Sequence, residues 1–445
     1  MWTTSPSHTI SRLADATPPS RDRYVDFLRA VAILAVVCGH WLIATIQRTP
    51  HGIEIGNVLS GSAGLRPATW VFQVMGVFFV VGGFSTRRTI EAKGSFDAGA
   101  FFASRVERLL RPTLVFVAVW MLGAAVLLAA GVDARLTHAI ARIAAQPLWF
   151  LAVYLVVTLI APVQLAIHRR SPALLIVALP LVTIVGDWLR FSDHASGVAV
   201  LNYLFVFAFA QEVGFHLSAG WDRITRSVAV GAAAVALLGL LVAVTVGPYP
   251  VSMVGLPGAR VSNMSPPTVC ILLLTVMQTA VFTLLRPAGQ RWLSRRGPWI
   301  ATVTANAGIM TIFLWHLSAA AIVGAGFYAM DVLPVPGSTR WWLFKLPWFA
   351  ACLVLLVVLV LAFVSFERLP AWTGRERGRA WVRAVGMLLA VRGFAGFALT
   401  GFDHVLRSGG SPFLGLRLSP LVDLVLLLVG YLLACGVPAP RRRAT

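Results

Sequence analysis

The chain has 445 residues, of which 58% are hydrophobic and only 12% are charged, and its mean hydropathy is +0.81. A soluble globular domain carries roughly 25% charged residues, so the composition excludes a soluble protein and predicts an integral membrane protein. The formal net charge of +20 comes almost wholly from arginine. These basic residues lie in short clusters between apolar segments, which is typical of membrane topology and argues against nucleic-acid binding.

The N-terminal segment, residues 1–20, is polar and lacks the apolar stretch that a cleaved signal peptide needs. We interpret it as a cytoplasmic tail. A bilayer core needs about 20 mostly apolar residues per helix. Such segments recur twelve times, at approximately 26–46, 70–86, 113–131, 148–167, 173–189, 199–217, 227–247, 268–285, 300–328, 346–364, 384–402 and 419–437.

The placement of the basic residues predicts the topology. Most of the arginines fall in alternate loops, together with both ends of the chain, so the positive-inside rule predicts a multi-pass protein of the cell (plasma) membrane with both termini in the cytoplasm. The eleventh segment is the weakest, because Arg392 lies in its middle and a charge there must face protein or water.

The stretch "DFLRAVAILAVVCGH" (26–40) carries three ionisable side chains in an otherwise apolar helix. On an α-helix, Arg29 and His40 lie about 20° apart around the axis and about 16.5 Å apart along it, with Asp26 within about 60° of both. Ionisable residues inside the membrane are mostly functional, so this face is interpreted as the lining of a polar cavity. The alternative is that the three residues have structural roles: Asp26 caps the helix, Arg29 is a topology charge and His40 is a hydrogen-bonded residue of the bundle. Asp26 either pairs with Arg29 or caps the helix.

Two arginines at the start of the third segment, Arg105 and Arg108, are three positions apart and share one face. Guanidinium groups match phosphate oxygens, so the two arginines are candidates for binding phosphate groups. The alternative is that they only set the topology of the helix. His316, deep in the ninth segment, fits an interhelical hydrogen bond as well as a pocket. Trp149 lies at a predicted interface, where tryptophan usually anchors a helix, and is also a possible pocket residue. Glu212 and Asn306 are weaker candidates. The remaining histidines have no predicted role: His8, His51, His138, His168, His194, His216 and His404.

The sequence lacks the motifs of several classes of enzyme. There is no G-x-x-x-x-G-K-[ST], no H-E-x-x-H and no G-x-S-x-G. The four cysteines show no metal-ligand spacing and are interpreted as packing residues. We therefore predict no metal site and no bound cofactor.

Four motifs, taken in order, resemble those of the acyltransferase family 3 membrane proteins. "RYVDFLRAVAILAVVCGH" is similar to the first-helix motif, in which ten residues separate an Arg or Lys from a His, here Arg29 and His40. "VMGVFFVVGGF" resembles the second-helix motif, with Gly82 where the family usually has serine. "FFASRVERLLRP" resembles the basic R-x-x-R segment before the third helix, and "QPLWFL" the entry to the fourth.

The resemblance covers about residues 21–365 and implies an all-α polytopic helix bundle of about 12 transmembrane helices, a ten-helix acyltransferase 3 core followed by two more in 366–438. Residues 439–445 form a basic cytoplasmic tail. The family implies transfer of an acyl group, typically acetyl from acetyl-CoA or another acyl-CoA co-substrate, to a hydroxyl of an envelope glycan, glycolipid or secreted small molecule.

The resemblance also implies roles for the singled-out residues. His40 would be the general base, because imidazole titrates near neutral pH. Arg105 and Arg108 would hold the phosphates of the acyl-CoA donor. From the helix face that it shares with His40, we infer that Arg29 lines the path from the donor to His40. The main alternative is a transporter or flippase, since twelve spans and a polar path would also serve transport, although the internal repeat of many transporters is not found.

Overall fold

The computed structural model describes residues 15, 17–18, 21–49, 52–92, 96–192, 196–368, 379–403 and 419–436. The predicted tails, 1–20 and 439–445, lie outside these residues apart from positions 15, 17 and 18. Eleven helical segments of the described part are long and apolar enough to cross a membrane. The prediction of an all-α polytopic bundle is therefore confirmed. The twelfth predicted span corresponds to an apolar helix of 16 residues.

The first compact unit, here called unit 1, contains the described parts of 1–43, 59–94 and 163–309. Its elements are α2 (Arg23–Ile43), η2 (Ala63–Ala68), α3 (Thr69–Phe72), α4 (Met75–Glu91), α8 (Pro172–Phe191), η3 (Ser196–Leu201), α9 (Asn202–Gly220), η4 (Trp221–Arg223), α10 (Arg226–Thr245), α11 (Val269–Leu293) and α12 (Arg296–Asn306).

The second compact unit, unit 2, contains the described parts of 44–58, 95–162 and 310–445. Helix α7 (Leu148–Arg170) contributes its first part to unit 2 and its last part, from residue 163, to unit 1. The other elements of unit 2 are β1 (Ala44–Thr49), β2 (Gly52–Asn57), α5 (Ala98–Ala129), α6 (Ala134–Ala145), α13 (Ile309–Ala329), α14 (Thr339–Arg368), α15 (Ala380–Thr400) and α16 (Pro420–Cys435), with η1 (Val58–Ser60) at its edge.

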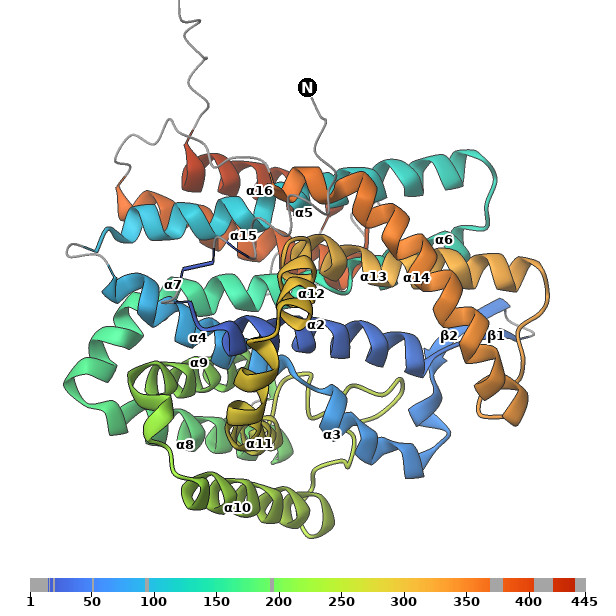
Figure 1. Ribbon diagram of the computed structural model, residues 1–445. Helices are drawn as coiled ribbons and strands as arrows, with labels where there is room; N and C mark the ends of the chain where they lie inside the picture. The colour runs from blue at the N-terminus through green and yellow to red at the C-terminus, as the bar shows by residue number, and fades with distance from the viewer. Residues whose placement is uncertain are drawn as a thin grey trace, which may run out of the picture. The chain divides into compact units, whose positions relative to one another are not determined.

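Helices α4 and α9 of unit 1 lie side by side (Figure 1), and two glycines permit their close approach. A Cβ atom at Gly83 would lie 2.2 Å from the carbonyl oxygen of Gln211, and one at Gly214 would lie 2.1 Å from that of Val80. Backbone therefore touches backbone at this crossing. Small residues at helix crossings are the usual means of tight packing between membrane helices.

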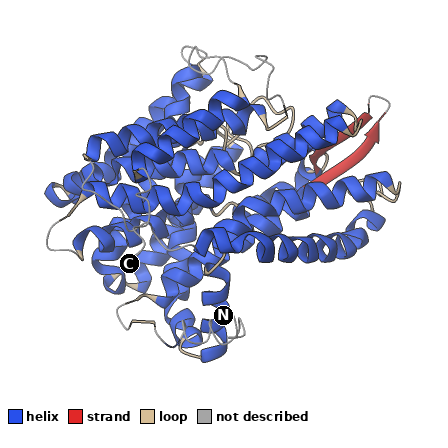
Figure 2. Cartoon of the chain, turned by 90° about the horizontal axis from the view of Figure 1, so that it is seen from above, coloured by secondary structure: helices blue, strands red, loops and turns tan. Residues whose placement is uncertain are grey.

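Three predicted spans differ from the structure. The second, 70–86, is interrupted at residues 73 and 74, between α3 and α4. The first was expected to run to residue 46, but α2 ends at Ile43 and the chain continues into an antiparallel hairpin, β1–β2, shown in red in Figure 2. The ninth was expected to be continuous, but α12 ends at Asn306 and α13 begins at Ile309. Asparagine and glycine are poor residues for a helix interior, and here Asn306 and Gly308 flank the break.

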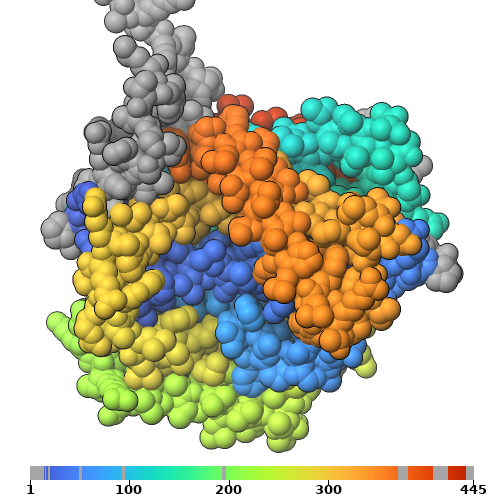
Figure 3. Space-filling model, turned by 45° about the vertical axis from the view of Figure 1, so that its right-hand side comes forward, coloured from blue at the N-terminus to red at the C-terminus, as the bar shows by residue number. Residues whose placement is uncertain are grey.

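Helix α14 carries the clearest lipid-type surface of unit 2 (orange in Figure 3). Leu346 and Leu361 are each 74% exposed, and Val354 is 66% exposed. Exposed aliphatic side chains along a 30-residue helix are what contact with hydrocarbon requires, since a helix bonds most of its backbone polar groups internally.

The charge inside the weakest predicted span has a partner. Arg392 of α15 donates from NH1 to Oδ1 of Asp423 on α16, at 2.7 Å. The side chain of Asp423 is fully buried and that of Arg392 is 16% exposed. A buried charge is tolerated when it is paired, which explains how α15 accommodates an arginine at its centre.

Candidate functional site

The predicted ionisable face on α2 is built from the start of the helix. Asp22 caps α2, because its Oδ1 accepts the backbone N–H groups of Tyr24 and Val25 at 3.0 and 3.2 Å. Asp26 therefore does not cap the helix. Its carboxylate is buried, with Oδ1 accepting from NH1 of Arg29 at 3.0 Å and Oδ2 from Nε of Arg21 at 2.5 Å.

Arg29 is held by two helices. Besides the pair with Asp26, its NH2 donates to Oγ of Ser85 on α4 at 3.0 Å, and Ser85 in turn donates to the carbonyl of Val81. The Arg29 side chain is 20% exposed. Ser85 lies three residues after Gly82, the position where the family usually has serine, so this chain supplies a hydroxyl one helical turn later.

His40 lies in the last turn of α2 and is half-buried. Since α2 is regular from Arg23 to Ile43, Arg29 and His40 share one face as their spacing predicts. Unit 1 therefore brings together Asp26, Arg29 and Ser85 by direct contacts and carries His40 on the same helix face. Asn306, a weaker candidate, donates to the backbone carbonyl of Asp26 at 2.9 Å.

The other predicted residues belong to unit 2. Arg105 and Arg108 lie near the start of α5; the Arg105 guanidinium carbon is 5.3 Å from the centre of the Phe101 ring, and Arg108 is exposed. Arg111, one turn further on, forms an ion pair with Glu107. The basic segment thus contains one arginine committed to a carboxylate within its own helix.

His316 and Trp149 are linked through aromatic rings of unit 2. The ring centres of Trp149 and Phe150 are 6.2 Å apart, those of Phe150 and Phe313 are 5.2 Å apart, and those of Phe313 and His316 are 5.9 Å apart. His316 is fully buried, and its Nδ1 lies 2.6 Å from the carbonyl oxygen of Phe313. A carbonyl only accepts, so the proton resides on Nδ1.

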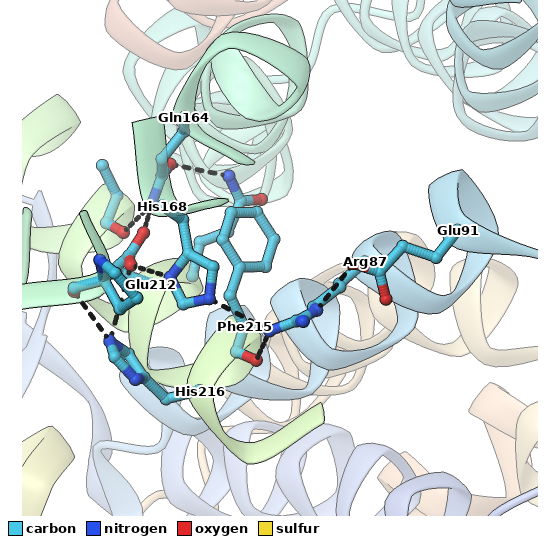
Figure 4. A network of polar contacts seen from close by, with 10 residues as sticks. Arg87, Glu91, Gln164, His168, Glu212, Phe215 and His216 are labelled. Carbon is cyan, nitrogen blue, oxygen red and sulfur yellow. Dashed lines mark hydrogen bonds and ion pairs between the residues drawn. The ribbon is translucent and has the colours of Figure 1, made fainter. Parts of the chain in front are cut away.

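A second ionisable cluster, the His168 network, joins α4, α7 and α9 in unit 1 (Figure 4). NH1 of Arg87 lies 3.0 Å from Nε2 of His168, and Nδ1 of His168 lies 2.5 Å from Oε1 of Glu212. Gln164 donates to Oε2 of Glu212 at 2.9 Å. Nε2 of His216 lies 3.6 Å from Glu212.

The hydrogen bonds of the His168 network fix its protonation. Arg87 can only donate, so Nε2 of His168 must accept, and the ring proton resides on Nδ1, where it is donated to Glu212. His168 is then neutral and lies between a cation and an anion. The same Arg87 also donates to the carbonyl of Phe215 and to Glu91, each at 3.0 Å.

Three ligand-type atoms of this network, on His168, Glu212 and His216, lie within 4.8 Å of one another. This cluster was not visible in the sequence, because its residues come from different helices. The absence of a metal site stays a prediction. A metal on Nδ1 of His168 would move the ring proton to Nε2, where it would face the Arg87 donor. The contact with Arg87 therefore disfavours a metal here.

His168 and His216 had no role predicted from the sequence, and Glu212 was a weak candidate. A signal was present in the spacing. Gln164 and His168 are four positions apart, and so are Glu212 and His216, which places each pair on one face of an apolar helix. Two such faces are able to meet, and they do so here.

Comparisons with known proteins agree with this architecture. The sequence model of the acyltransferase 3 family, described as an acyltransferase domain, matches residues 22–367. No curated protein and no solved structure matches the chain. The match covers the first-helix face, the basic start of α5 and the His168 network, and ends at the last turn of α14. Since it spans well over half of the chain, the protein belongs to the acyltransferase 3 family of membrane acyltransferases.

Proposed function

We propose that the protein transfers an acyl group, acetyl in the simplest case, from acyl-CoA to a hydroxyl group of a cell-envelope glycan, a glycolipid or a secreted small molecule. Membership of an acyltransferase family supports the transfer itself. One observation supports the site: Arg29, fixed by Asp26 and Ser85, lies on the helix face that also carries His40. A fixed cation and a base on one face suit a substrate with anionic phosphates and a reactive thioester.

In the proposed step, the neutral imidazole of His40 accepts the proton of the acceptor hydroxyl as its oxygen attacks the thioester carbonyl carbon. The tetrahedral intermediate collapses, the C–S bond breaks, and the imidazolium returns the proton to the departing thiolate. An ester and a CoA thiol are formed with no net change in protons. Arg29 attracts the donor toward this centre, and Asp26 acts as its positioning residue.

The proposal also assigns the sides of the membrane. Acyl-CoA enters from the cytoplasm, where Arg105 and Arg108 hold its phosphates, and both termini lie on that side of the plasma membrane. The distribution of arginine in alternate loops supports this orientation. The acceptor is then reached near the far end of α2, where His40 lies.

The test is thiol release from acetyl-CoA by the purified full-length chain in lipid nanodiscs, supplied with an extract of envelope lipids and glycans. Wild type is compared with His40→Ala and with His216→Ala, which removes a histidine of the same unit from outside the α2 face. We expect release that requires the extract, survives His216→Ala and falls by roughly 100-fold or more in His40→Ala, the usual contribution of a general base.

Each outcome is informative. Full activity of folded His40→Ala would refute the base assignment while leaving the transferase proposal intact. If wild-type protein of proven folding releases no thiol from several acyl-CoA donors but moves solute across proteoliposomes, the transporter alternative replaces the proposal.

A further inference from the structure

The last two helices, α15 and α16, form a tight hairpin beyond the part of the chain that the family model matches. A Cβ atom at Gly386 would lie 2.7 Å from the carbonyl oxygen of Gly430, and one at Gly430 would lie 2.6 Å from that of Gly386. The backbones of the two helices are therefore in contact. With the ion pair between Arg392 and Asp423, this contact gives the hairpin one defined packing arrangement.

Both helices of the hairpin pack on α5, and the contacts of α16 can be followed residue by residue. Sγ of Cys435 lies 3.8 Å from the carbonyl oxygen of Ala103, and one turn earlier the side chain of Tyr431 lies beside that of Arg111. Residue numbers rise along α16 as they fall along α5, so the two helices run antiparallel. The contact lies at the start of α5, within its basic segment.

The contacted face of α5 borders the face of the two predicted donor-binding arginines, because Arg108 lies about 60° around the helix axis from Arg111. Ala103, Glu107 and Arg111 follow one another at four-residue spacing and form one stripe. Around the helix axis, Arg108 lies about 100° and Arg105 about 160° from Glu107. Arg108 is exposed and Arg105 is half-buried. Helix α16 thus covers the stripe but does not itself cover Arg105 or Arg108.

We propose that the α15–α16 hairpin is a positioning element for acyl-CoA binding: it fixes the rotation of α5 so that Arg105 and Arg108 face the donor phosphates. This rests on the proposed function of those two arginines. Tyr431 is the positioning residue of the contact, because its side chain lies beside Arg111, which Glu107 already holds by an ion pair. This contact joins the hairpin to α5.

The test measures acyl-CoA binding and kinetics of the full-length chain in nanodiscs. Tyr431→Phe removes one hydroxyl and keeps the ring. Tyr328→Phe, on α13, is the matched control, because the ring of Tyr328 contacts Arg48 and only its hydroxyl is lost. A third protein carries Arg105→Gln with Arg108→Gln, and reports on the donor site itself.

We expect Tyr431→Phe to raise the Kd and KM for acyl-CoA about threefold or more, with kcat and the KM for the acceptor unchanged, and Tyr328→Phe to match wild type. A merely structural contact would lower the amount of active protein and leave KM unchanged. If the double arginine variant loses donor affinity and Tyr431→Phe does not, the hairpin proposal alone is overturned. If the double variant binds acyl-CoA as well as wild type, the donor site of the proposed function is wrong and the hairpin proposal falls with it.

Discussion

Glu212 accepts the Nδ1 proton of His168 at 2.5 Å, and through that imidazole it is joined to Arg87. The Glu212 side chain is fully buried and that of His168 is 5% exposed. A buried carboxylate without compensation is costly. The neutral imidazole between the two charges lets a cation on α4 stabilise an anion on α9 although the two do not touch. The His168 network is thus a charge-balanced joint between three helices of unit 1.

The first prediction concerns the anion of this joint. Glu212→Gln keeps the shape of the side chain but removes the buried charge that Arg87 stabilises through His168, and its amide group would meet the Gln164 donor or the His168 donor. We expect the free energy of unfolding to fall by about 3 kcal/mol, as for other broken buried pairs, measured as a lower Tm in detergent. His216→Ala is the control and should change stability by less than about 1 kcal/mol, because its contact is 3.6 Å long and the side chain is 38% exposed. Equal Tm values for Glu212→Gln and wild type would contradict the balance argument.

The second prediction concerns metal binding at the same residues. Because Arg87 fixes the Nε2 atom of His168 as an acceptor, wild-type protein should retain no zinc after dialysis and show no zinc-dependent rise in Tm. In Arg87→Met, the ring proton is able to move to Nε2, and Nδ1 becomes available as a ligand. A zinc-dependent rise in Tm is then expected only in that variant. One zinc ion per wild-type chain, lost in His168→Gln, would show that the tautomer assignment is wrong.

Much of the fold was predictable, because apolar segments of membrane length are a strong one-dimensional signal. The α2 face was predictable for the same reason: Asp26, Arg29 and His40 lie on one helix, so their relation depends only on helical spacing. The break between Asn306 and Ile309 was less visible, because a short interruption hardly changes the hydropathy of the segment.

The contacts between helices could not be predicted from the sequence. His168, Glu212 and Arg87 come from three helices, and nothing in a single sequence fixes which faces of α4, α7 and α9 meet. Arg392 is the same case: its position suggested a weak span, and only the packing of α16 brings Asp423 to it. Ser85 as a partner of Arg29 also depends on the packing of α4 against α2.

The third prediction compares two adjacent glycines of the second-helix motif. Gly83→Ala would place a methyl group 2.2 Å from the backbone of α9 at Gln211, so the helices must separate. We expect a loss of about 2 kcal/mol or more, the usual cost of overpacking. Gly82→Ala is the matched control: no atom lies within 4 Å of a Cβ built there, and alanine favours a helix by about 1 kcal/mol over glycine. Its Tm should equal or exceed that of wild type, and similar losses in both variants would refute the close crossing of α4 and α9.

The fourth prediction concerns the ion pair of the C-terminal hairpin. Arg392→Gln leaves the fully buried carboxylate of Asp423 without its cation, which should cost about 3–5 kcal/mol. Asp423→Asn should be similarly harmful because it leaves the arginine uncompensated. The double variant replaces two charges by two neutral amides of similar size and should recover most of the loss. The measurement is a double-mutant cycle on Tm and on the yield of folded protein in membranes.

The cycle separates charge compensation from packing. If the pair acts through charge, the double variant is more stable than either single variant, since neither residue then leaves a buried charge behind. If the two positions contribute only through packing, the losses simply add. Additive losses would contradict the view that Asp423 is what allows α15 to carry an arginine at its centre, and α15 would then need another source of compensation.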